Sequence, residues 1–270
     1  MNVRPAAVAG TFYPADPALL AATVDALLAE ARVGHGPERA PPKALILPHA
    51  GYVYSGPTAA RGYVSVRARA EEIERVVVIG PAHRVDVAGV AAAGVDGFAT
   101  PLGTVPVDVA ALEAVPSVAS SPLAHAREHC LEVHLPFLQR MFPGAKVIPL
   151  VTRGPASEVA RVLEALWGGA ETLVVISSDL SHYLPYAAAR AIDEDTAQRI
   201  EALDPRGLDP ERACGAAAID GLLEVARARG LRIERLDLRS SGDTAGRRDE
   251  VVGYGAFGFH EPGSDAGGRA

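Results

Sequence analysis

The chain has 270 residues with 33 acidic side chains against 26 lysines and arginines, which gives a formal net charge of −7 at pH 7. This excess of acidic groups argues against a nucleic-acid or anionic-membrane partner, because both kinds of binding require clustered lysine and arginine. Hydrophobic residues make up 49% of the chain and charged residues 22%, a composition typical of a globular protein and too polar for a chain that lives in lipid.

The N-terminal residues lack the charged segment and following apolar stretch of a signal peptide, so we expect a cytoplasmic protein. The chain has two cysteines, Cys130 and Cys214, and we do not expect a disulfide framework. Apolar residues at helical spacing follow the capping residue Asp16 and predict a first helix over 16–32. The segment 34–42 is predicted to be a loop.

Short continuous apolar runs mark the strands that follow. Residues 43–47, 75–79 and 172–177 are typical of strands buried on both faces. Further strands are predicted at 87–93, 146–151, 231–238 and 251–259, helices at 56–70, 131–141, 193–203 and 214–226, and a polar loop at 240–249. The alternation predicts one α/β domain over 1–260, with a largely parallel or mixed central sheet flanked by helices, and a disordered tail at 261–270.

Three of these strands end at residues that can bind a metal or transfer a proton. His49 follows the first strand, His83 the second, and Asp179 and His182 the third. Because the carboxyl ends of parallel strands meet at one edge of a sheet, we expect these side chains to lie together. With the thiol of Cys214 they suit a first-row transition metal better than calcium or magnesium. On the residues alone, Cys214 is equally compatible with a small core residue.

The segment 128–134 combines two glutamates with two histidines. At helical spacing Glu128 and Glu132 share one face. His129 and His134 are five residues apart, which does not match the His-Glu-x-x-His arrangement of zinc proteases. We therefore expect these histidines to orient ligands or transfer protons rather than both to bind metal. A salt-bridged surface helix is the alternative.

A serine-hydrolase interpretation of Ser177, Ser178, Asp179 and His182 is disfavoured, because the chain has no Gly-x-Ser-x-Gly motif. We interpret Asp179 and His182 instead as metal ligands or as a general acid–base pair.

Several motifs, in this order along residues 4–260, together resemble the Memo family, whose prokaryotic members are called AmmeMemoRadiSam system protein B. They are Ala9–Pro14, Pro48–Gly56, Gly80–His83, Glu128–Phe137, Ser177–Tyr183 and Val252–Tyr254. The resemblance implies a fold like that of class III extradiol dioxygenases, which hold non-haem iron(II) at strand ends. It further implies that the metal ligands are His49, His83 and Cys214, and that the neighbouring pocket residues are Asp179, His182, Glu128, His129 and His134.

The resemblance implies iron(II) or copper as cofactor, with zinc less favoured, and oxygen-dependent or redox chemistry on an unknown small substrate. A second hypothesis is a non-enzymatic protein that binds metal or a peptide and acts with partner proteins, for which the family name indicates radical-SAM and Amme-domain proteins. A zinc hydrolase or lyase is the third, because His, Cys and Asp also suit zinc. Cys130 stands where the family motif has serine. It could be a metal ligand, a redox partner or an inert replacement for that serine, and we favour the last.

Overall fold

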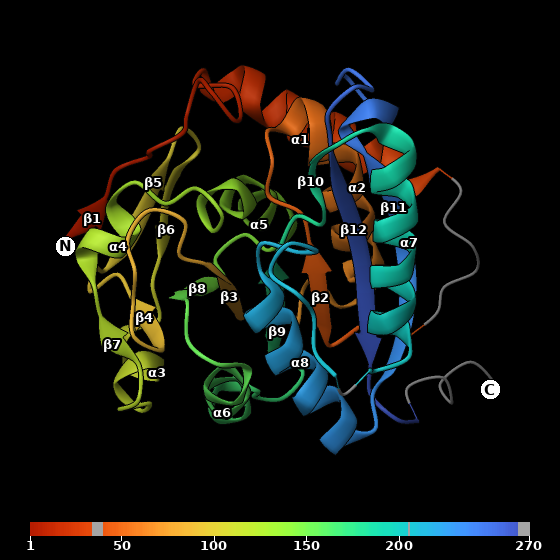
Figure 1. The fold of residues 1–270 in the computed structure, drawn as a ribbon. Coiled ribbons are helices and arrows are strands. Elements are labelled where there is room, and N and C mark those ends of the chain that lie inside the picture. Colours follow the sequence, from red (N-terminus) through yellow and green to blue (C-terminus); the bar gives the residue numbers. More distant parts are fainter. Residues whose placement is uncertain (34–39, 205, 264–270) are drawn as a thin grey trace, which may run out of the picture.

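Four parallel strands form the centre of the fold, as the continuous apolar runs predicted. They pair in the order β2 (Ala44–Leu47), β9 (Thr172–Ser177), β3 (Arg75–Pro81) and β8 (Lys146–Thr152). The computed structural model describes residues 1–33, 40–204 and 206–263. In Figure 1 helices lie on both sides of this central sheet, so its strands are buried on both faces and lack a polar side.

Antiparallel strands extend the sheet on both sides and make it mixed. Within the described ranges the sheet has nine strands, and β12 runs antiparallel to β2 while β4 runs antiparallel to β8. The outer strands are β4 (Val90–Ala92), β7 (Ala119–Ser120), β10 (His182–Leu184), β11 (Arg232–Ser240) and β12 (Val251–His260). A separate small sheet contains β1 (Val3–Arg4), β5 (Gly97–Thr100) and β6 (Gly103–Pro106), none of which the sequence patterns predicted.

The helices pack against two apolar layers, one on each face of the sheet. Successive residues of β2 alternate between them, since Leu45 belongs to one layer and Ile46 to the other. The first layer is packed by α1 (Pro17–Arg32), α2 (Tyr52–Ser65) and α5 (Leu135–Met141), and the second by α6 (Ala156–Leu166), α7 (Tyr186–Glu201) and α8 (Ala216–Arg229). Two short helices, α3 (Val109–Glu113) and α4 (Pro122–Ala126), lie near β7 in the chain.

Three helix predictions need correction at their ends. The helix predicted over 56–70 is α2, which spans Tyr52–Ser65 and contains Pro57. Because proline has no N–H, the Val53 carbonyl four residues earlier receives no helical hydrogen bond from it, and Val53 is exposed to water. The helix predicted over 193–203 begins two turns earlier, at Tyr186. In the predicted helix 131–141, a 3₁₀ turn over Glu132–His134 precedes α5.

Two predicted irregular segments are only partly described. Residues 34–39 of the predicted loop 34–42 and residues 264–270 of the predicted disordered tail lie outside the described residues. Within the tail, Glu261 accepts a hydrogen bond from the indole Nε1 of Trp167 at 3.2 Å. Across the described ranges, none of the helices combines the length and apolar character needed to span a membrane.

A buried ion pair joins the N-terminal strand to the segment ahead of α5. Arg4 Nη1 donates to Glu132 Oε2 at 2.6 Å, and both side chains are almost completely buried. Glu132 also accepts the Tyr13 hydroxyl at 2.6 Å and the backbone N–H groups of Ala7 and Val8. Its two oxygens are therefore fully occupied, as a buried carboxylate requires. The prediction that Glu128 and Glu132 share a helical face is wrong, because this stretch is not an α-helix.

Replacing Glu132 by glutamine should destabilise the protein strongly, because the buried Arg4 guanidinium loses its counter-charge. We expect the free energy of unfolding to fall by about 3–5 kcal/mol, measured by urea denaturation. The exposed pair Arg140–Asp25 is the control, and Arg140→Ala should cost no more than about 1 kcal/mol. Equal effects of the two substitutions would contradict this account.

Candidate metal centre

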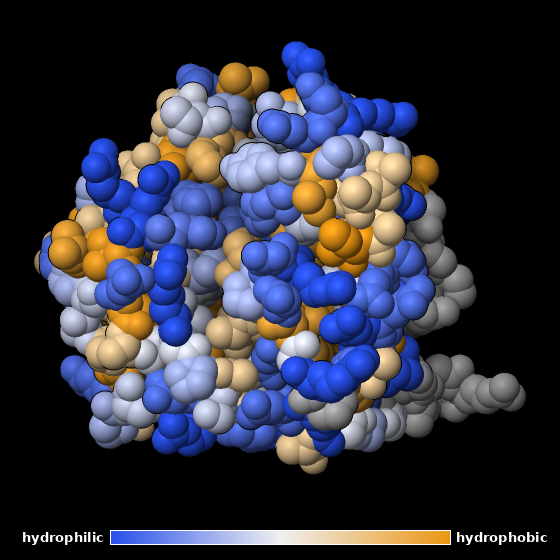
Figure 2. Space-filling view, viewed as in Figure 1, coloured by the Kyte–Doolittle hydropathy of each residue, from blue (hydrophilic) through white to orange (hydrophobic). Residues whose placement is uncertain are grey.

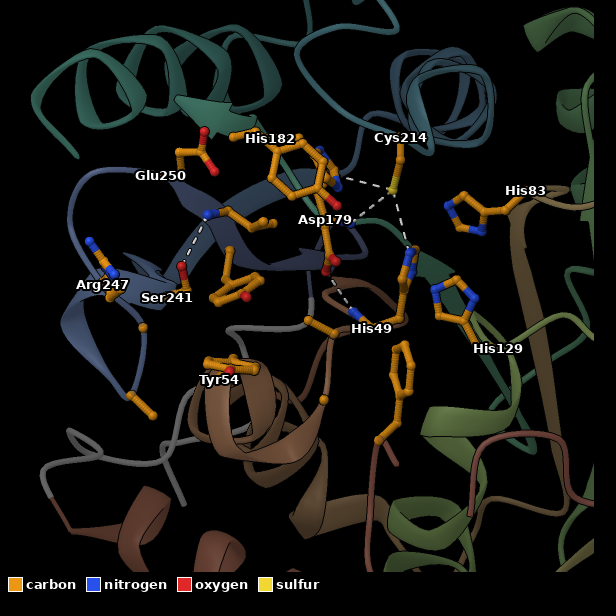
Figure 3. A pocket seen from close by; sticks show the side chains of 18 of the residues that line it. His49, Tyr54, His83, His129, Asp179, His182, Cys214, Ser241, Arg247 and Glu250 are labelled. Carbon is orange, nitrogen blue, oxygen red and sulfur yellow. Dashed lines mark hydrogen bonds between the residues drawn. The ribbon is translucent and has the colours of Figure 1, made fainter. Parts of the chain in front are cut away.

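The carboxyl ends of β2, β3 and β9 open into a pocket of about 1000 Å³. Hydrophilic residues predominate on the face of the molecule shown in Figure 2. The predicted site residues His49, His83, His129, Asp179, His182 and Cys214 all line this pocket. Figure 3 shows His49, His83, His129, Asp179 and Cys214 gathered at one end of the pocket, Tyr54, Arg247 and Glu250 toward the other, and His182 between the two groups. The sequence-based expectation that the strand-end residues meet is therefore confirmed.

His49 is held by the neighbouring strand end. Its backbone N–H donates to Asp179 Oδ1 at 2.8 Å, and its ring Nδ1 lies 2.7 Å from Ser177 Oγ. The ring is almost completely buried. Burial lowers the pKa of His49 well below its ordinary value, and the neighbouring histidines lower it further. His49 is therefore a neutral imidazole, the form that binds metal.

The hydrogen-bond partners of Ser177 show which ring nitrogen of His49 carries the proton. The Ser177 hydroxyl donates its one hydrogen to the carbonyl of Cys130 at 2.7 Å, and a carbonyl can only accept. The two ring nitrogens that touch Ser177 Oγ, His49 Nδ1 and His134 Nε2, must then both be donors. His134 Nδ1 is left to accept the Tyr63 hydroxyl at 2.9 Å. The Nε2 atom of His49 consequently presents a lone pair.

The same hydrogen bonds make Ser177 unsuitable as a nucleophile. Its oxygen donates one bond and accepts two, so it has no hydrogen available for a base. Ser178 donates to the Asp179 carbonyl and accepts the Gly215 N–H. Neither hydroxyl is paired with His182, and the serine-hydrolase interpretation gains no support.

His83 is oriented by Glu128. The Glu128 carboxylate accepts the His83 backbone N–H at 2.7 Å and lies 2.9 Å from its ring Nδ1. Burial alone would raise the pKa of Glu128, but contact with His129 and His83 outweighs it and lowers that pKa. A carboxylate cannot donate, so His83 Nδ1 carries the proton and its Nε2 is the remaining nitrogen for a ligand.

Cys214 lies in the loop ahead of α8 and joins the site from the opposite side. Its Sγ is 3.4 Å from His49 Nε2, and the Asp179 backbone N–H donates to it at 3.3 Å. Gly215 allows this close approach, because a Cβ there would lie 2.7 Å from Ser178 Cβ. Burial raises the pKa of the Cys214 thiol to about 12, and the charge of Asp179 adds to that effect.

The donor atoms of His49, His83 and Cys214 all lie within 4.8 Å of one another. Metal–nitrogen bonds of about 2.0 Å and metal–sulfur bonds of about 2.3 Å at a tetrahedral angle place ligand atoms about 3.5 Å apart. The His49–Cys214 separation already matches that spacing. A small inward movement of His83 would complete a three-ligand site, so the donor set fits a transition metal.

Of the other predicted site residues, His129 and Asp179 line the pocket and His134 does not. His129 stacks on His83 with ring centroids 4.7 Å apart, and its Nδ1 lies 3.1 Å from Glu128 without hydrogen-bond alignment. His83, Glu128 and His129 form a second group of closely spaced donors. Asp179 is buried, which raises its pKa although the His49 N–H opposes the rise. His134 is not among the pocket residues and is linked to the site through Ser177.

Sequence patterns did not reveal the roles of Ser177, Tyr63 and Glu132. A serine at the end of a strand carries no signal that it accepts from two histidines, and Tyr63 is 71 residues away from His134 in the chain. Cys130 is fully buried, with its Sγ 3.2 Å from the Pro81 carbonyl. A Cβ at Gly80 would lie 2.6 Å from this sulfur, so Cys130 packs tightly behind the pocket.

Comparison with known sequences identifies the family of this chain. The family described as Memo-like protein matches residues 4–257, a range that contains all three donors. The chain belongs to the Memo family. Proteins named MEMO1 family protein from Aquifex aeolicus, Ignicoccus hospitalis and Archaeoglobus fulgidus are 37%, 36% and 35% identical to it. These alignments cover 94%, 97% and 93% of this chain and 98%, 100% and 97% of the relatives. The Memo resemblance inferred from the motifs is thereby confirmed.

Removing the Ser177 hydroxyl should weaken metal binding by this Memo chain. Ser177→Ala takes away the acceptor that fixes the His49 tautomer, and loss of such a partner costs about 10–100-fold in metal affinity. Tyr63→Phe leaves Ser177 in place and should cost less. Competition titrations with a chromophoric chelator measure both affinities, and ¹⁵N NMR of the metal-free protein reports the His49 tautomer. Wild-type affinity in Ser177→Ala would contradict the assignment.

Acidification should destabilise the fold before the carboxylates titrate. Burial lowers the pKa of His125 to about 4 and that of His134 to about 3, whereas both titrate near 6.5 when unfolded. Between these values the unfolded chain binds protons that the folded chain does not, so the free energy of unfolding falls as the pH drops below about 6.5. Each histidine contributes at most about 1.4 kcal/mol per pH unit. Urea titrations between pH 7 and pH 5 test this, and a level free energy across that range would refute it.

Proposed function

We propose that this Memo-family chain is a metalloprotein that binds iron(II) or copper through His49, His83 and Cys214 and acts in redox chemistry on a small substrate. The observation that carries the proposal is the convergence of three donors from three separate elements at one end of a pocket. Both histidines have their Nδ1 atoms engaged by protein groups, which leaves Nε2 for a ligand.

The chemistry of the donor set favours a transition metal over a hard cation. Two imidazoles and one thiolate are borderline to soft ligands, whereas calcium and magnesium bind oxygen. Three protein ligands leave positions open for substrate or oxygen, as catalytic rather than structural sites do. When bound, iron or copper supplies Lewis acidity and one-electron redox chemistry. Zinc fits the same ligands and is the less favoured choice.

Three further residues of the pocket wall can bind substrate or exchange protons with it. His129 lies beside the proposed ligands, 5.4 Å from His49 between ring centroids. His182 is half-buried and also lines the pocket. One carboxylate oxygen of Asp179 accepts the His49 backbone N–H, which holds His49 against the end of β9. A histidine in contact with substrate is suited to general acid–base catalysis near neutral pH.

The size of the pocket supports a small-molecule substrate. A volume of about 1000 Å³ lies at the upper end of the range found for small-ligand sites. The donor atoms of His49, His83 and Cys214 lie at one end of the pocket. A molecule bound in the pocket could therefore place one of its ends beside them.

Metal analysis tests the proposal directly. After anaerobic purification the wild-type protein should contain about one iron or copper ion per chain, and His49→Ala and Cys214→Ala should contain little. Cys130→Ser is the matched control, because its sulfur contacts a carbonyl behind the pocket, and it should retain the metal. A wild-type protein without stoichiometric transition metal would refute the proposal.

Oxygen uptake then separates the functional classes. With a panel of catechols and small phenols, the redox proposal requires turnover that is lost in His83→Ala. Stoichiometric metal without turnover would favour the non-enzymatic binding hypothesis, and bound zinc would favour a hydrolase or lyase.

A further inference from the structure

The exposed aromatic side chains of this protein gather at one place. The chain has seven tyrosines, six phenylalanines and one tryptophan, all within the described ranges. Tyr54 and Tyr183 are the two that are exposed, by 39% and 72%, and both line the pocket that contains the candidate metal centre. Burial of an aromatic ring is a large stabilising contribution, so two rings left in water at one pocket indicate a ligand.

Tyr183 adopts a backbone conformation that bulky residues avoid. Its φ is +56°, in the left-handed region. It is the additional residue of a bulge in the pairing of β10 with β12, because His182 faces Val252 and Leu184 faces Val251. Bulges redirect side chains and are frequent beside active sites. The bulge places the Tyr183 ring in the pocket wall, and backbone conformations of this kind are frequent at active sites and ligand sites.

The two tyrosines lie on different elements around a shared neighbour. Tyr54 belongs to α2 and Tyr183 to β10. Burial chiefly raises the pKa of Tyr254, and the phenol groups of Tyr54 and Tyr183 both contribute to that rise. Tyr54, Tyr183 and Tyr254 all line the same pocket. Figure 3 places Tyr54 across the pocket from His182, the residue next to Tyr183.

The charged side chains at this outer part of the pocket are mostly acidic. Glu211, Asp249 and Glu250 line it, and the basic residue among the pocket residues is Arg247. Arg247 Nη2 lies 2.7 Å from Asp249 Oδ2, so its charge is already matched. The remaining carboxylates of Glu211 and Glu250 make the outer pocket favourable for a cation and unfavourable for an anion.

We propose that the outer half of the pocket is a subsite for a cationic group, an ammonium carried by an organic substrate, which binds against the faces of Tyr54 and Tyr183. Aromatic faces attract cations, and rings combined with nearby carboxylates are the common solution for ammonium recognition. The inference rests on the proposed function, since it places the other end of the same substrate at the metal centre. It makes Tyr183 a specificity-determining residue.

A charge series built on one skeleton tests the subsite. Tyramine is cationic, tyrosol is its neutral alcohol analogue, and 4-hydroxyphenylacetate is anionic. Isothermal titration calorimetry on the full chain should show tyramine binding about tenfold more tightly than tyrosol, and the anion binding most weakly. The Glu211→Gln, Glu250→Gln double variant should reduce the preference for tyramine over tyrosol. Equal affinities for tyramine and tyrosol would overturn the proposal.

Variants of Tyr183 separate recognition from structure. Tyr183→Leu should lose most of the tyramine preference and Tyr183→Phe should keep it. Tyr183→Gly should lose the preference without lowering the urea midpoint of unfolding, because glycine tolerates the left-handed backbone. Leu123→Ala is the control, since Leu123 is similarly exposed, by 70%, and lies outside the pocket residues. Wild-type preference in Tyr183→Leu would overturn the proposal.

Metal content measured in the same samples keeps the two proposals distinct. A protein that holds stoichiometric metal but shows no preference for the cation refutes the subsite alone. A protein without metal that still prefers tyramine refutes the metal proposal and retains the subsite.

Discussion

The single hydrogen of the Ser177 hydroxyl constrains the centre of this protein. Because it is donated to the Cys130 carbonyl, the nitrogens of His49 and His134 that touch the same oxygen must both donate. This one hydrogen bond fixes the His49 tautomer, gives the buried polar groups around Ser177 their partners and leaves the His49 Nε2 lone pair facing Cys214. Buried polar networks of this kind are stable only when every member is satisfied.

The location of the site could be predicted from the sequence, but its internal connections could not. Continuous apolar runs identified β2, β3 and β9, and parallel strands necessarily end along one edge, so His49, His83 and Asp179 had to approach one another. Cys214 lies in a loop ahead of α8 whose position no periodicity predicts; on the residues alone it was equally compatible with a core residue, and the family resemblance assigned it to the site. Glu128 and Glu132 contact different groups because residues 128–131 form no α-helix and a 3₁₀ turn begins only at Glu132.

The buried pair Arg4–Glu132 connects the N-terminal segment to the site. Glu132 holds the Ala7 and Val8 backbone and the Tyr13 hydroxyl, and the Phe12 carbonyl accepts the Tyr52 N–H at 2.8 Å. Phe12 is thereby held against His129, with ring centroids 4.9 Å apart. An ion pair outside the pocket thus helps to set the wall beside the proposed ligands. Both ends of the chain contribute to this wall, since Tyr254 also lines the pocket.

The position of β2 inside the sheet determines when the metal centre can exist during synthesis. β2 is made early, yet its neighbours β9 and β12 begin at Thr172 and Val251. Cys214 is 165 residues beyond His49. A nascent chain therefore emerges with His49 and His83 long before the thiol or either flanking strand is available, and such distant pairings form slowly. The three donors can converge only after Cys214 and the strands beside β2 have been made, so the proposed site could bind metal only late in synthesis.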